Sequence, residues 1–251
     1  MVRHAHHAHH PRSVPAAFAL PAQHDDPMTI LLIPGLLCDA YCWQPVTDRI
    51  EAEVADLSSQ DSISRMADDC LKAYAGTLQV AGHSMGARVA MEMARMAPDR
   101  VERLALLDTG IHPLKDGEAE SRRELVEYAY EHGMEALAAR WLPPMVYEPN
   151  RTKALMDGLT EMVLRSDEDQ HARQIKALVN RPDASAYLPD IRCETLVMVG
   201  RQDEWSPVSR HERMLELLPN ARLEVIEDAG HFAPLEQPET VADLLVPFLK
   251  G

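Results

Sequence analysis

The chain has 251 residues, 46% of them hydrophobic and 26% charged, a composition that predicts one soluble globular domain with a sizeable core. The formal net charge of -15 at pH 7 argues against binding to nucleic acid or an anionic membrane, because both require a positive surface. We therefore expect a small-molecule partner, with no nucleic acid and no membrane, and a monomer or homodimer.

The four cysteines are too few and too scattered for a disulfide framework in a domain of this size. This predicts free thiols in a reducing compartment, and hence a cytoplasmic protein. Cys38 and Cys42 are one helical turn apart, but no Cys/His pair of matching spacing accompanies them, so we expect no metal site.

Residues 1–27 differ in kind from the rest, since they hold half of the twelve histidines and several prolines. This composition predicts a disordered His-rich leader or tag. From residue 28 to about residue 110, apolar runs alternate with helical periodicity, which indicates a parallel sheet covered on both faces. The predicted strands of this part span 28–33, 53–57, 78–81 and 101–107, and the predicted helices span 43–50 and 64–74, with a third that ends before Pro98.

Residues 111–190 carry only helical signals, which predicts a helical cap inserted between core strands. The predicted helices of this segment span 118–131, 134–141, 151–165 and 167–179. The alternation resumes over 191–251 with strands at 195–199 and 222–226, a helix at 210–218, and a last helix from about residue 238 that Pro247 should bend or end early. The predicted fold is therefore α/β, a mostly parallel, doubly wound sheet built from 28–110 and 191–251.

The stretch AGHSMGARVA places Ser84 on a sharp corner between the predicted strand and helix. Gly82 and Gly86 flank it and lack the Cβ atoms that would collide there, as in a Gly-x-Ser-x-Gly nucleophile elbow. A serine hydroxyl becomes a useful nucleophile when a base takes its proton and an acid orients the base. Asp203 in GRQDEWSP and His231 in DAGHFAPLEQPE each follow a later strand, so all three side chains should meet at one edge of the sheet.

Together these three motifs resemble those of the α/β-hydrolase superfamily, over residue 28 to the C-terminus. The resemblance implies a nucleophile at Ser84, a general base at His231 and an orienting acid at Asp203. It also implies an oxyanion hole made by the backbone N–H groups of Leu36 and Met85.

The sequence departs from the superfamily at Pro34, where a histidine that often props the oxyanion loop is usual. Asp108 also follows a predicted strand and could reach the base in place of Asp203. We expect His83 to pack beside the nucleophile or line the pocket floor. The histidines without a sequence partner are expected at the surface; they are His112, His132, His171 and His211.

The triad predicts a carboxylesterase-like serine hydrolase of the EC 3.1.1 type that forms an acyl-enzyme and requires no cofactor. Apolar residues of the cap, including Trp141 and Met145, should contact the substrate. Acidic residues outnumber basic ones in the cap, which favours small to medium neutral esters over phosphorylated substrates or an acidic carrier protein.

Two alternatives remain open. The same triad could serve a C–C bond hydrolase, an eliminating lyase or a lactonase, because these enzymes share the motifs. A non-catalytic ligand-binding protein of the same fold is the other alternative, and only substrate tests separate the three.

Overall fold

The computed structural model describes residues 28–251, so the predicted leader lies outside the described residues. In the described part, a six-stranded sheet has the strand order β2-β1-β3-β4-β5-β6, and every pairing in it is parallel. The strands are β1 (Thr29–Ile33), β2 (Glu53–Val54), β3 (Leu78–His83), β4 (Val101–Leu107), β5 (Glu194–Gly200) and β6 (Ala221–Ile226).

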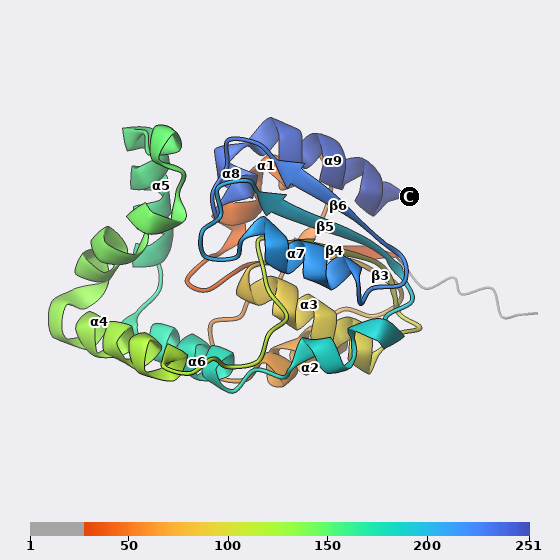
Figure 1. Cartoon of the computed structure of the whole chain (residues 1–251), viewed down its shortest axis with the longest axis horizontal. Helices are drawn as coiled ribbons and strands as arrows, with labels where there is room; N and C mark the ends of the chain where they lie inside the picture. Colours follow the sequence, from red (N-terminus) through yellow and green to blue (C-terminus); the bar gives the residue numbers. More distant parts are fainter. Residues whose placement is uncertain (1–27) are drawn as a thin grey trace, which may run out of the picture.

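The sheet lies between helices (Figure 1), with α1 (Gln44–Thr47) and α9 (Pro238–Lys250) on one side and α2 (Ile63–Ala73) and α3 (Met85–Met96) on the other. The helix α7 (Val208–Leu215) packs against β5 and β6, and the short α8 (Ala233–Glu236) precedes α9. This arrangement confirms the predicted parallel sheet with two covered faces. It also explains why the central strands are mostly apolar: each residue of β3 is buried.

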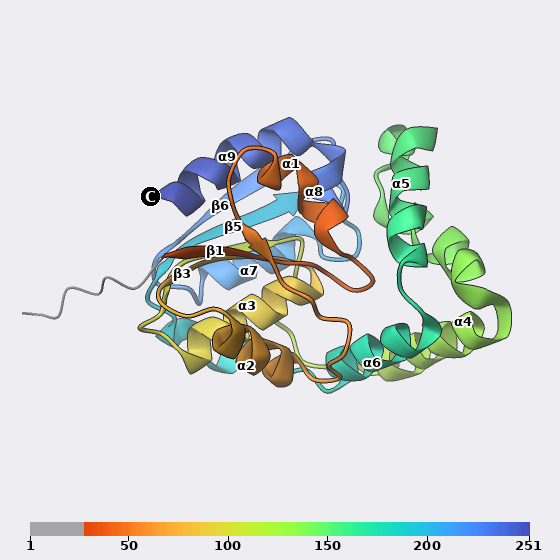
Figure 2. The ribbon, with the colours of Figure 1, turned by 180° about the vertical axis from the view of Figure 1, so that it is seen from behind.

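Residues 111–190 contain no strand and join β4 to β5. We call this segment the helical insert. Its helices are α4 (Glu118–Trp141), α5 (Lys153–Leu164) and α6 (Glu168–Val179), with single 3-10 turns at Pro143–Met145, Glu148–Asn150, Ala184–Ala186 and Leu188–Asp190. From the back (Figure 2), α6 runs beside α4, and α5 stands over the sheet edge at which the strands end.

Most element boundaries agree with the predictions within a few residues, but three features differ. The two helices predicted for the first half of the insert form one element, which bends at Gly133, where φ is 84°. The second strand is only two residues long. The helix α9 continues through Pro247 to Lys250. Proline has no N–H to donate to the Asp243 carbonyl, but Pro247 and Asp243 both lie on the exposed face of the helix, where water can replace that hydrogen bond.

No helix in residues 28–251 combines the length and the apolar character needed to cross a bilayer.

Candidate active site

Ser84 occupies the corner between β3 and α3 with a φ of 54° and a ψ of -113°, a backbone conformation that non-glycine residues rarely adopt. The flanking glycines make the corner possible. A Cβ on Gly82 would lie 2.4 Å from the Gly86 carbonyl oxygen, and one on Gly86 would lie 2.1 Å from the Ile33 carbonyl oxygen. The predicted elbow is therefore present, and only glycine fits at both positions.

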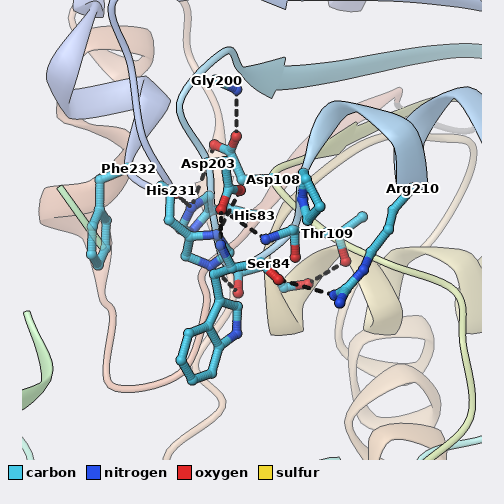
Figure 3. Close-up of polar contacts among 12 residues, drawn as sticks. His83, Ser84, Asp108, Thr109, Gly200, Asp203, Arg210, His231 and Phe232 are labelled. Carbon is cyan, nitrogen blue, oxygen red and sulfur yellow. Dashed lines mark hydrogen bonds and ion pairs between the residues drawn. The ribbon is translucent and has the colours of Figure 1, made fainter. Parts of the chain in front are cut away.

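His231 lies between Ser84 and Asp203 (Figure 3). Its Nε2 is 2.8 Å from Ser84 Oγ, and its Nδ1 is 2.8 Å from Asp203 Oδ2. The second Asp203 oxygen accepts the backbone N–H groups of Trp205 and Ser206. Burial alone would raise the pKa of Asp203, but His231 and the Ser206 N–H hold it below its usual value. The ionised carboxylate makes His231 Nδ1 the donor and leaves Nε2 free to accept the serine proton.

His83 is buried beneath this group and lies outside the cavity wall. Its Nε2 is 2.7 Å from the His231 carbonyl oxygen, so Nε2 carries the proton and donates it. Its Nδ1 is then an acceptor, 3.7 Å from Cys42 Sγ. His83 thus supports the backbone of the residue predicted as the base.

Asp108 is fully buried just after the end of β4, and it makes no hydrogen bond or ion pair with the His231 ring; its Oδ2 lies 3.7 Å from His83 Nε2. One of its carboxyl oxygens accepts the Gly200 N–H at 2.9 Å, while the other has no hydrogen-bond partner among the described residues. Burial, together with the charge of Asp203, raises the pKa of Asp108 well above its usual value. The carboxyl group in contact with His231 is therefore that of Asp203.

The loop after β1 brings Leu36 to the wall of the same cavity as Ser84 and Met85. Met85 is the first residue of α3, so its N–H has no partner within the helix. The Leu36 N–H has no hydrogen-bond partner among residues 28–251. Both N–H groups predicted for the oxyanion hole are therefore available.

A glutamine of the insert holds this loop, and sequence reasoning missed it. Gln174 in α6 is 1% exposed; its Oε1 accepts the Leu37 N–H at 2.9 Å, and its Nε2 donates to the Leu57 carbonyl at 3.1 Å. Leu37 has a φ of 56°, which costs a non-glycine residue about 1–2 kcal/mol. Gln174 therefore stabilises, at Leu37, the same loop in which Pro34 replaces the usual histidine.

The cavity beside Ser84 has a volume of about 250 Å³, close to the lower end of the range for small-molecule sites. Trp141 and Met145, predicted to contact the substrate, both lie in its wall, as does the exposed Trp205.

The expectation that four histidines lie at the surface is wrong for three of them. His171 is buried in the cavity wall, and the half-buried His112 lies in the same wall. His211 is buried; it accepts the Thr109 N–H and lies 3.2 Å from the Pro207 carbonyl oxygen. Thr109 is 102 residues from His211 in the sequence, so the local pattern gave no sign of this contact.

The insert is tied to the loop that carries His231. The Met145 carbonyl accepts the His231 N–H at 2.7 Å. Two residues further on, the Tyr147 N–H donates to the Glu236 carboxylate at 2.9 Å, and Asn150 Nδ2 donates to the Asp228 carbonyl at 2.6 Å. The segment 145–150 therefore fixes both sides of the His231 loop.

Cys38 and Cys42 do acquire a histidine partner, from a strand that sequence spacing did not reveal. The ligand atoms of these two cysteines and His83 all lie within 4.8 Å of one another, and all three residues are buried. A soft metal ion could be held by such a set, but a tetrahedral site would require a fourth ligand. All four cysteines are free.

A parallel sheet with a serine elbow, and with histidine and aspartate on later strand ends, is the arrangement of an α/β hydrolase. Residues 30–244 match the model of the alpha/beta hydrolase family, and the chain belongs to this family.

Proteins similar to this chain are described as enzymes that catalyse different reactions. A 2-hydroxy-6-oxononadienedioate/2-hydroxy-6-oxononatrienedioate hydrolase of a Pseudomonas species is 29% identical over 177 residues, which cover 67% of this chain and 61% of that protein. A thermophilic esterase from Thermogutta terrifontis has a TM-score of 0.80 and 28% identity, with 90% of each chain covered. The enol-lactonase from Burkholderia xenovorans LB400 also has a TM-score of 0.80, at 21% identity over 90% of this chain and 92% of that one, which shows a shared fold.

Proposed function

We propose that this α/β hydrolase is a serine carboxylesterase that cleaves small to medium esters through Ser84, His231 and Asp203. The observation that carries the proposal is the continuous chain of two 2.8 Å contacts from the Ser84 hydroxyl through the His231 ring to the Asp203 carboxylate. Histidine and aspartate in this relation are what a serine needs to act as a nucleophile at neutral pH.

In the proposed reaction, Ser84 Oγ attacks the ester carbonyl carbon while His231 Nε2 takes the hydroxyl proton. The negative oxygen that forms is stabilised by the Leu36 and Met85 N–H groups. His231 then donates its proton to the leaving alkoxide, which departs as the alcohol and leaves an acyl group on Ser84. Water, deprotonated by His231, attacks this acyl group and releases the acid. Asp203 stabilises the imidazolium form of His231 in both halves of the reaction.

In this proposal, the helical insert acts as a cap that selects the substrate through Trp141 and Met145. The free cysteines support a cytoplasmic location, where thiols stay reduced.

A second candidate is hydrolysis of a carbon–carbon bond or a lactone. It is favoured by the relatives, because the Pseudomonas protein is described as a hydrolase of an oxo-dienedioate and the structurally similar Burkholderia protein as an enol-lactonase. The residues that activate Ser84 would serve these reactions equally well.

The experiment is hydrolysis of p-nitrophenyl esters from acetate to laurate by the wild type and by Ser84→Ala, with circular dichroism of both. Turnover of the shorter esters by the wild type, reduced by about 10⁴-fold or more in a folded Ser84→Ala, is the expected result. A folded wild type without ester turnover would overturn the proposal and direct attention to the second candidate.

A further inference from the structure

Arg88 is a buried charge whose hydrogen-bonding capacity is not used. It lies in α3 one helical turn after Ser84 and in the wall of the same cavity. The residue is only 8% exposed; Nη2 donates to the His112 carbonyl at 3.3 Å, whereas Nη1 is buried with no partner among the described residues. A buried, unpaired guanidinium nitrogen is costly, so a site of this kind calls for an acceptor from outside the chain.

The charges around Arg88 do not neutralise it. Besides Arg88, the described residues of the cavity wall include Lys115, Arg122 and Arg210, against one carboxylate, Glu118. The Glu118 carboxylate already accepts from Arg122 at 2.9 Å and from Arg181 at 2.7 Å. The cavity of this acidic chain is therefore cationic, the reverse of the balance in the helical insert as a whole.

The two histidines in the wall do not alter this balance. Burial, together with the charge of Arg88, lowers the pKa of His112 to about 4, and burial with the charge of Arg122 lowers that of His171 to about 4. Both rings are neutral at pH 7. Burial and neighbouring positive charge also act on Arg88 itself: burial and the charges of Arg181 and Arg122 lower its pKa to about 9. A bound anion would relieve this repulsion.

We propose that Arg88 anchors a carboxylate at the non-reacting end of the substrate, so that the enzyme prefers esters carrying a free carboxylate, such as half-esters of dicarboxylic acids. This inference rests on the proposed function and names the substrate class of the same site. A carboxylate matches the planar guanidinium fork, and its negative charge fits the cationic wall. A cavity of about 250 Å³ holds a short chain between the anion and the ester group.

The test compares matched substrates that differ by one charge. On the acyl side, 4-nitrophenyl hydrogen glutarate is compared with 4-nitrophenyl pentanoate, and on the alcohol side, 4-acetoxybenzoate with its methyl ester. For at least one pair, we expect the wild type to have a kcat/KM about tenfold or more higher for the carboxylate member, mainly through KM. This preference should fall by about tenfold in Arg88→Met and by less in Arg88→Lys, which keeps the charge but loses the fork.

Arg123→Met is the matched control, because Arg123 neighbours Arg122 in α4 but lies outside the cavity wall with 59% of its side chain exposed. It should keep the wild-type preference. If Arg88→Met does not fold, inhibition of the wild type replaces it: glutarate should compete with substrate, and the neutral glutaramide should not.

The failures of the two proposals are distinguishable. A wild type that hydrolyses both members of each pair equally, or a preference that survives in folded Arg88→Met, overturns the anion site and leaves the esterase intact. A wild type that hydrolyses none of the four esters overturns the esterase itself.

Discussion

Replacing Gln174 with methionine tests how the oxyanion loop is held. Methionine fills a similar volume, but it leaves the Leu37 N–H and the Leu57 carbonyl without the partners they have at 2.9 and 3.1 Å. A buried polar group without a partner costs about 1–3 kcal/mol, and two groups lose their partner, so Gln174→Met should lower the free energy of unfolding by about 2–6 kcal/mol. Because the loop also presents the Leu36 N–H, we expect kcat to fall by about 10- to 100-fold, approaching the loss of one oxyanion donor.

The assay is ester hydrolysis under saturating substrate, with urea unfolding in parallel. Gln174→Glu separates the two contacts, since a carboxylate can accept from Leu37 but cannot donate to Leu57; its kcat should lie closer to that of the wild type. Gln170→Met, on the same helix, is the matched control, because no side-chain hydrogen bond of Gln170 is found among residues 28–251. A folded Gln174→Met with the kcat of the wild type would refute the reasoning.

Three further perturbations address the triad, the insert and the elbow. Asp203→Asn should lower kcat by about 10³- to 10⁴-fold, because Asp203 is the carboxylate that accepts the His231 Nδ1 proton. Asp108→Asn should lower kcat less than about tenfold, because Asp108 accepts the Gly200 N–H and makes no hydrogen bond to the His231 ring; equal losses in steady-state kinetics would contradict this assignment. Burial alone would raise the pKa of Glu118, but hydrogen bonds from Arg181 and Arg122 lower it from 4.5 to about 2. The stability that the ionised carboxylate contributes is therefore complete above pH 4.5 and is lost as the pH falls toward 2. The difference in unfolding free energy between the wild type and Glu118→Gln should shrink over that range, and a constant difference in denaturant titrations at each pH would argue against the ion pair. Gly86→Ala should yield little folded protein, since its Cβ would meet backbone at 2.1 Å; a thermal melt like that of the wild type would show that the corner can relax.

Much of the site could be predicted because its residues follow strands. Ser84 comes directly after β3, and Asp203 and His231 lie on the loops that follow β5 and β6. The ends of parallel strands meet at one edge of a sheet, whatever the length of the chain between them. The prediction for β2 is too long. Ala55 and Leu57 continue the apolar alternation of a strand, but only Glu53 and Val54 pair with β1.

The supporting contacts could not be predicted, because they join segments that nothing local relates. Gln174 reaches Leu37 across 137 residues of sequence, and His83 reaches the His231 carbonyl across 148. Arg88 donates to the carbonyl of His112, which belongs to the insert, and its position in α3 does not indicate this contact. Periodicity reports which face of a helix is apolar, but it does not report which distant element covers that face.

The hydrogen bond from the His231 N–H to the Met145 carbonyl limits how this chain can be recombined with its relatives. Exchanging residues 111–190 as one unit would place the backbone of another protein beside the loop that carries His231. The His231 N–H would then keep an acceptor only if the new segment placed a carbonyl where that of Met145 lies. A chimera that exchanges α4 and the α5–α6 pair separately, and keeps 142–150 with the sheet, preserves this bond. Such a chimera must also keep Gln174 in α6, because its side chain is hydrogen-bonded to the core at Leu37 and Leu57.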